Sequence, residues 1–249
     1  ELRVGNRVAW HREYLLEILP NEDQVVHRGW LRYYDELPER NHDHPDNTLR
    51  YYNTYLGIDL AISQKDTADY TAMVAVHVFG FQESLKVYVD PLIINKRLTH
   101  LQTLETIAQV VETLGDKYKV DIIVEDVGYQ SSVIEQLQNK NYRVEPFKVL
   151  GADKRARFIS VSHLFEFGRV YLPRSSGKEL ANQLTGFGVE KHDDLVDAIV
   201  MTLGKVVSKD KPVGSYNRVV VGKHSLWKDF DDFENGRGRW SLGRFDQQW

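Results

Sequence analysis

The order of strand-like and helix-like segments between residues 55 and 207 is the feature that most limits the fold of this chain. Three apolar or alternating segments come first, and their pattern predicts strands over 55–62, 70–80 and 84–90. The sequence FGFQES between the second and third segments indicates a hairpin turn. The first part of the sheet is therefore expected to be antiparallel.

Helix-like and strand-like segments then alternate. Helical stripes are predicted over 99–117, 131–141, 153–168, 177–187 and from 191 onward. Extended segments are predicted over 120–126, 142–149 and 168–173, and Pro146 favours a sheet edge for the second of them. The whole order predicts an α/β fold with a mixed sheet, in which three antiparallel strands are followed by parallel strands and helices flank the sheet.

Composition excludes several classes of protein and site. The 249 residues include no cysteine, which rules out disulfides and thiolate metal sites and suits a reducing cytoplasm. The formal net charge is only −4, so any binding to phosphates must use a local basic patch. The sequence shows neither a signal peptide nor an apolar run long enough to span a membrane. We therefore expect a soluble protein without membrane contact.

Asp59 lies in the middle of an otherwise apolar predicted strand. Alternation places Gly57, Asp59 and Ala61 on one face, where small neighbours leave room beside the carboxylate. A carboxylate buried in a strand is costly unless it is paired or bound to a metal. The alternative is an ion pair with a buried base, but Lys65, the nearest base downstream, lies beyond the strand. We interpret Asp59 as a candidate site residue.

Two further acids, Glu125 and Asp126, end the strand predicted over 120–126. Simple strand termination is the alternative explanation, but this end of a sheet is where α/β folds place their sites. Adjacent residues point to opposite faces, and Glu125 shares a face with Ile123 while Asp126 begins the turn. We therefore expect Glu125 to face Asp59.

The segment KHDDLVDAIV places Asp193, Asp194 and Asp197 at the start of the last helix. Spacings of three and four residues put them on one helical face. Acids at a helix N-terminus also offset the helix dipole, which is the alternative reading. Carboxylates converging from three segments would repel one another without a cation. Oxygen ligands without cysteine favour Mg²⁺ or Mn²⁺, and two ions are expected by analogy with two-metal nucleases.

A basic group follows the predicted edge strand, and its members are Lys148, Lys154, Arg155 and Arg157. These residues are candidates for contact with phosphate groups, although a solvated helix face would have the same composition. Tyr129 is expected to cover the core. His192 is expected to cap the last helix, rather than to bind metal or carry protons.

Four segments, YLGIDLAISQKDTADYTAMVAV, IIVEDVGYQSSVIEQL, GADKRARF and KHDDLVDAIV, resemble the nuclease domain of phage large terminase subunits, which belongs to the ribonuclease H-like superfamily. The resemblance covers roughly residues 55–207. It implies a ribonuclease H-like sheet and an endonuclease that cuts concatemeric viral double-stranded DNA during packaging. The catalytic residues that it implies are Asp59, Glu125, Asp194 and Asp197, and Asp126 and Asp193 join them as candidate metal ligands.

The resemblance also predicts the domain organisation and the partners. AWHREYLLEILP resembles the segment that precedes such a nuclease, so residues 1–54 are expected to be a linker from an ATPase motor, 55–207 the nuclease, and 208–249 a flexible or partner-binding tail. The start at Glu1 fits a fragment of a longer chain. No GxxxxGK[ST] phosphate loop occurs, so we expect no ATPase activity. The implied partners are the portal and the small terminase subunit, in the host cell cytoplasm and not in the mature virion.

Three other functions are compatible with parts of the sequence. A resolvase-like or transposase-like nuclease of the same superfamily would use the same chemistry on a different DNA. A non-catalytic docking module of a packaging motor would need none of it. GIDLA also resembles the first phosphate loop of actin-like and sugar-kinase ATPases, but EDVGYQ has too few glycines for the second loop.

Overall fold

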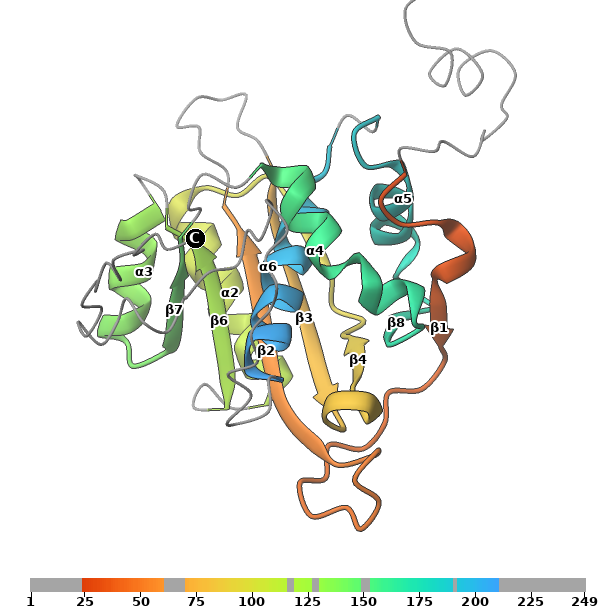
Figure 1. Ribbon diagram of the computed structural model, residues 1–249. Helices are drawn as coiled ribbons and strands as arrows, with labels where there is room; N and C mark the ends of the chain where they lie inside the picture. Colours follow the sequence, from red (N-terminus) through yellow and green to blue (C-terminus); the bar gives the residue numbers. More distant parts are fainter. Residues whose placement is uncertain are drawn as a thin grey trace, which may run out of the picture. The chain divides into compact units, whose positions relative to one another are not determined.

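The computed structural model describes residues 24–60, 70–115, 119–126, 130–148, 153–189 and 192–210. Within these residues, eight strands form one mixed sheet with the order β1-β8-β4-β3-β2-β6-β7, and β5 also pairs with β3 (Figure 1). The strands are β1 (Arg32–Tyr34), β2 (Tyr51–Asp59), β3 (Thr71–Phe79), β4 (Lys86–Val89), β5 (Ile94–Lys96), β6 (Val120–Glu125), β7 (Arg143–Phe147) and β8 (Val170–Pro173). The helices are α2 (His100–Leu114), α3 (Gln130–Asn139), α4 (Lys154–Glu166), α5 (Lys178–Gly186) and α6 (Asp194–Lys209), with two short 3-10 helices, η1 (Arg28–Trp30) and η2 (Gln82–Ser84).

The sheet has an antiparallel part and a parallel part, as the segment order predicts. β2 is antiparallel to β3, and β3 is antiparallel to β4. On its other side β2 is parallel to β6, which in turn is parallel to β7. β7, which contains Pro146, is an edge strand of the sheet, as expected from the sequence. The predicted mixed α/β architecture is therefore confirmed.

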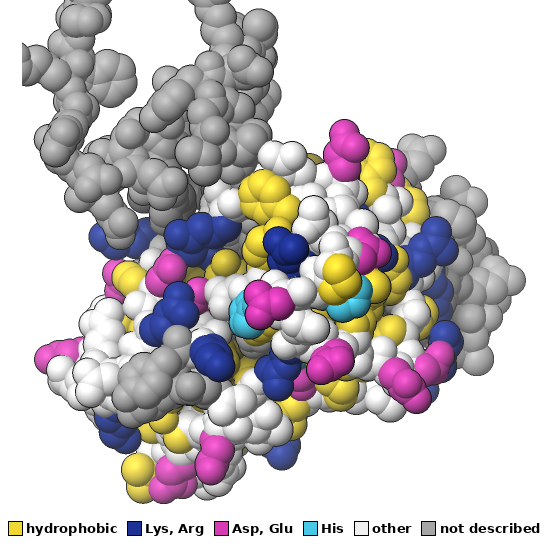
Figure 2. All heavy atoms as spheres, turned by 90° about the horizontal axis from the view of Figure 1, so that it is seen from below, with side chains coloured by type: hydrophobic (Ala, Val, Ile, Leu, Met, Phe, Trp, Pro, Cys, Tyr) yellow, Lys and Arg dark blue, Asp and Glu magenta, His cyan; other side chains and the backbone are white. Residues whose placement is uncertain are grey.

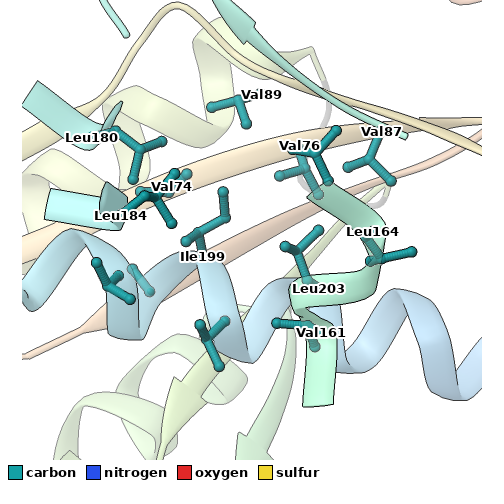
Figure 3. Close-up of a cluster of buried hydrophobic side chains, with 14 of the residues drawn as sticks. Val74, Val76, Val87, Val89, Val161, Leu164, Leu180, Leu184, Ile199 and Leu203 are labelled. Atoms are coloured by element: carbon teal, nitrogen blue, oxygen red, sulfur yellow. The ribbon is translucent and has the colours of Figure 1, made fainter. Parts of the chain in front are cut away.

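Helices cover the sheet on both faces. α4, α5 and α6 pack on one face, and α2 and α3 pack on the other (Figure 1). Figure 3 shows part of the first layer, where Ile199 and Leu203 of α6 pack against Val74 and Val76 of β3. The flanking side chains drawn there come from α4 (Val161 and Leu164), from α5 (Leu180 and Leu184) and from β4 (Val87 and Val89).

Strand alternation in β2 decides what faces α6. Leu56 and Ile58 are fully buried in the layer of α2 and α3. Gly57 faces the opposite layer, because a Cβ atom added there would lie 2.1 Å from Thr202 Oγ1 of α6. Asp59, two residues further on, shares the face of Gly57. The predicted faces are confirmed for Gly57 on one side and for Leu56 and Ile58 on the other, whereas Ala61 lies outside the described residues. β2 ends at Asp59, so this acid lies at the end of the strand, whereas the sequence predicts it in the middle.

Part of the segment predicted to be a linker, residues 1–54, belongs to the sheet and its core. β1 pairs in parallel with β8, and Val25, Val26 and Leu31 are buried in the layer beneath α4, α5 and α6. Neither β1 nor β5 is predicted from sequence, since three residues are too few to display an alternation. The helix expected around Trp10 to Ile18 and the tail from residue 211 onward lie outside the described residues. No helix among the described residues is long and apolar enough to cross a membrane.

Candidate functional site

Three elements bring acidic side chains to one end of the sheet. Asp59 is the last residue of β2 and Glu125 is the last residue of β6. The two strands are parallel, and Ile58 pairs with Val124, so both acids lie at the same strand end. α6 begins at Asp194 and packs on β2 and β3, and its first turn contains Asp194 and Asp197. Acids from β2, β6 and α6 therefore converge, as the sequence predicts.

Among these acids, Asp59 has the largest shift in pKa. Burial raises its pKa, and the negative charges of Asp197, Glu125 and Asp194 raise it further, to about 8. The ordinary value for this carboxyl group is 3.8. A carboxyl with its pKa near neutrality is held in an environment that resists its negative charge. That environment would accept a positive charge beside Asp59.

The start of α6 is fixed by a side chain from α5. The Leu195 amide donates a hydrogen bond of 3.0 Å to Oε1 of Gln183. Asp193 occupies the N-cap position, but its side chain makes no capping hydrogen bond. Gln183 therefore caps the helix in place of Asp193. Asp194 and Asp197 lie in the first turn, where acids offset the helix dipole, so this alternative explanation is also compatible with the structure.

Asp194 and Asp197 differ in their surroundings. Oδ2 of Asp194 is buried and has no hydrogen-bond partner among the described residues, and burial followed by the charge of Asp193 raises the pKa of this side chain. Burial also raises the pKa of Asp197 to about 6, although Lys154 opposes the shift. His192 Nδ1 lies 3.9 Å from Oδ2 of Asp194, which is within ion-pair distance but too far for a hydrogen bond. A positive ligand placed closer to this oxygen would satisfy it.

Two cations of α4 lie between the acids. Lys154 Nζ lies 2.7 Å from Asp193 Oδ1 and also pairs with Asp197 Oδ2. Arg157 Nη1 donates to Glu125 Oε1 at 3.2 Å, and Arg157 Nη2 lies 3.8 Å from Asp197 Oδ1. The sequence assigns both cations to DNA phosphates, whereas in the structure both contact the acid cluster.

The remaining predicted residues lie in different places. Asp126 accepts a hydrogen bond of 2.9 Å from Ser131 at the start of α3, and it is not among the acids that act on Asp59. Its place among the predicted metal ligands therefore has no support in the geometry. Lys148 is exposed at the end of β7 and contacts no acid of the cluster in the described residues, and Arg155 is half-buried on α4. Tyr129 lies outside the described residues.

His192 does not cap α6, and that prediction is wrong. The N-cap residue is Asp193, and the His192 ring instead meets the Tyr70 ring edge-on at a centroid distance of 5.1 Å. The Arg97 guanidinium lies 5.1 Å from the centroid of the same Tyr70 ring. Sequence reasoning missed the role of Gln183, because a glutamine has no motif and Gln183 reaches the start of α6 only through tertiary packing.

The acids fit a hard divalent cation in their chemistry but not in their present arrangement. Among the residues that the structure describes, no group of three acidic or histidine side chains is placed to hold a metal ion as it stands. Lys154 and Arg157 occupy the space between Asp197 and its neighbours. The candidate metal ligands are still all carboxylate oxygens. Asp59 lies among other acids, and Oδ2 of Asp194 has no hydrogen-bond partner among the described residues. The oxygens of Asp59 and Asp194 thus have the chemistry that a Mg²⁺-like ion prefers, although the described side chains are not arranged around one.

One face of the molecule carries mixed charges. Figure 2 shows the molecule from below the view of Figure 1, and on that face Lys and Arg side chains are interspersed with Asp and Glu. Basic and acidic groups therefore do not gather into one large patch there. The acid cluster is a property of the end where β2, β6 and α6 meet, and not of this face of the surface.

Comparison with known proteins gives a consistent picture. A family model for the terminase RNaseH-like domain matches residues 56–205. The large terminase nuclease of thermophilic phage G20c with bound magnesium is 15% identical, with a TM-score of 0.50, and the match covers 75% of this chain and 99% of that chain. Its cobalt-bound form gives the same values. The P22 large terminase nuclease domain is 11% identical, with a TM-score of 0.49 and coverage of 75% and 92%.

At these identities the two G20c structures show a similar fold and no more than that. Among curated proteins, none matches this chain.

Proposed function

This chain belongs to the terminase RNaseH-like domain family, and from that premise we propose that it is a metal-dependent DNA endonuclease that cuts concatemeric viral DNA during genome packaging. The observation that carries the proposal is the convergence of carboxylates from β2, β6 and α6 at one end of the sheet. Three separate chain segments supply these carboxylates. Their meeting at one place favours a shared site over three unrelated local roles.

We propose Asp59 and Asp194 as the first residues to hold the ion, joined by Glu125 and Asp197. Mg²⁺ or Mn²⁺ is the expected ion, because every candidate donor is a carboxylate oxygen, and two ions are expected. Magnesium and cobalt in the structures of the G20c nuclease support a divalent ion in this fold. When bound, such an ion supplies activation of water and stabilisation of the charged oxygens of a phosphodiester.

The protein's own residues perform the other tasks. Gln183 fixes the first turn of α6, so that Asp194 and Asp197 keep their position relative to Asp59. Arg157, whose side chain is only 11% exposed, ties β6 to α6 through Glu125 and Asp197. Lys148 and Arg155 remain the proposed contacts to DNA phosphates, and such contacts weaken as salt rises and read no base sequence.

The finer parts of the proposal rest on the resemblance. The substrate is double-stranded DNA, and the portal and the small terminase subunit are the proposed partners in the host cell cytoplasm. The absence of ATPase activity in this chain stays a prediction. The proposed boundaries of the nuclease, 55–207, also stay a prediction, with the addition that β1 and its neighbours complete the sheet.

Plasmid cleavage tests the proposal. Wild-type protein with Mn²⁺ or Mg²⁺ is expected to cut supercoiled plasmid, and Asp59→Asn, which keeps the side-chain shape but removes the charge, is expected to reduce cutting to background. Glu112→Gln on the exposed face of α2 is the matched control and should cut like the wild type. Equal cutting by wild type and Asp59→Asn would contradict the proposal.

Two outcomes of the same assay would favour the alternatives. A plasmid that stays intact with every metal, while the protein still binds packaging components, would favour the docking module. Stronger cutting of branched DNA than of linear duplex would favour a resolvase-like nuclease.

A further inference from the structure

One helix delivers both cations that enter the acid cluster. Lys154 and Arg157 are three residues apart at the start of α4, so they lie on one helical face. Lys154 pairs with Asp193 and Asp197, and Arg157 pairs with Glu125 and Asp197. The two side chains are not equivalent, and the difference between them has a consequence for metal binding.

The cations divide the carboxylates into two groups. Asp193, Asp197 and Glu125 each contact a cation of α4. In the part of the chain that the structure describes, Asp59 and Asp194 have no lysine or arginine within ion-pair distance. The charge of Lys154 acts on both from further away, and His192 Nδ1 lies 3.9 Å from Asp194 Oδ2. A divalent ion bound by Asp59 and Asp194 alone would have two protein ligands. To gain Asp197 as a further ligand, the ion must take over an oxygen that already faces a cation.

Arg157 is built into the site more firmly than Lys154. Its side chain is 11% exposed, and its guanidinium also lies 6.0 Å from the centroid of the Phe147 ring. Lys154 is 36% exposed, and its ammonium group is a single charge on a flexible four-carbon stem. Lys154 can therefore move its charge into solvent with little loss of packing, whereas Arg157 cannot.

We propose that Lys154 is a displaceable counter-ion, which holds Asp193 and Asp197 together in the metal-free protein and competes with the divalent ion for them. This inference rests on the proposed function, because it concerns the same metal site. Lys154 is a positioning residue in this view. It stabilises the acid cluster before the metal arrives and lowers the affinity for the metal, because binding must break its two ion pairs.

The test measures metal binding and stability and does not depend on DNA cutting. Titration calorimetry with Mn²⁺ at mildly alkaline pH gives the Kd, and thermal unfolding with and without Mn²⁺ gives Tm, both on the full 249-residue chain. Lys154→Met is expected to bind Mn²⁺ roughly three- to tenfold more tightly than the wild type, because the metal no longer has to break two part-exposed ion pairs. Without metal, its Tm should lie below that of the wild type, because Asp193 and Asp197 then lack their counter-ion.

Two variants make the result specific. Lys154→Arg keeps the charge and should return the Mn²⁺ Kd to near the wild-type value. Lys205→Met is the matched control, since Lys205 of α6, like Lys154 of α4, pairs with a carboxylate, but with that of Glu145, away from the acid cluster. It should lose one surface ion pair and leave the Mn²⁺ Kd unchanged.

The outcomes separate this inference from the proposed function. If wild-type protein binds Mn²⁺ but Lys154→Met binds it equally or more weakly, Lys154 does not compete with the metal and the inference is wrong. If wild-type protein shows neither heat of binding nor a Tm shift with Mn²⁺, the metal site itself is refuted, and the inference falls with it.

Discussion

The close approach of β2 and α6 at Gly57 gives the most direct test of how the fold positions the site. An added Cβ atom at residue 57 would lie 2.1 Å from Thr202 Oγ1 and 2.2 Å from the Ala198 carbonyl oxygen. Ordinary van der Waals contact begins at 3.4 Å, so these distances are too short by 1.3 Å and 1.2 Å. Gly57→Ala therefore forces the helix and the strand apart.

The expected magnitude follows from which atoms are in the way. Thr202 could rotate, although it would lose its hydrogen bond of 2.7 Å to the Ala198 carbonyl, but that carbonyl belongs to the helix backbone and cannot. Overpacking of a core typically costs 1–3 kcal/mol, and a backbone clash belongs at the upper end, about 3 kcal/mol. For a domain of this size, that cost lowers Tm by about 6–12 °C. Because α6 carries Asp194 and Asp197, metal-dependent cutting should fall as well.

Thermal unfolding of purified variants measures this effect, with Gly29→Ala as the control. An added Cβ at residue 29 meets nothing within 4 Å, so that variant should stay within about 0.5 kcal/mol of the wild type. The double variant Gly57→Ala/Thr202→Ala should recover only part of the loss, since the Ala198 carbonyl remains. A Gly57→Ala protein as stable as Gly29→Ala would refute the close approach and, with it, the described placement of α6.

Two further predictions concern the support of the site and the pH dependence of stability. Gln183→Met removes the acceptor for the Leu195 amide and should lower the free energy of unfolding by about 1 kcal/mol, as the loss of a helix cap does. Urea-induced unfolding measures this loss, and an unchanged midpoint would show that Gln183 does not hold α6. Asp90 directly follows β4. Burial raises its pKa, but hydrogen bonds from His77 and the Leu92 amide outweigh burial and hold the pKa below 3.8. Because the folded pKa is lower than the unfolded one, these bonds stabilise the protein above about pH 4 and lose their effect as the pH falls further. Asp90→Asn should thus lower Tm at about pH 7 and should differ less from the wild type below about pH 4. A difference in Tm that stays constant with pH would contradict this reasoning.

Much of the fold follows from local patterns in the chain. The alternation in β2 sets Gly57 and Asp59 against Leu56 and Ile58, and the structure has the same two faces. The helical stripe of α6 is equally local, and Leu195, Ile199 and Val206 are all buried. These patterns repeat over several residues, so each is visible without knowledge of what it packs against.

The arrangement of charges in the site was decided by tertiary structure. Asp59 was recognisable from sequence because a lone acid in an apolar strand is costly wherever that strand packs. Nothing local indicates that Lys154 and Arg157 turn toward the acids and not toward solvent, since both readings fit a basic helix start. Likewise β1 exists only because β8 lies beside it, and Gln183 reaches Leu195 only because α5 packs on α6. Residue type and spacing thus determined which acids can form a site, whereas the partner of each charge depended on contacts between distant segments, which no local periodicity records.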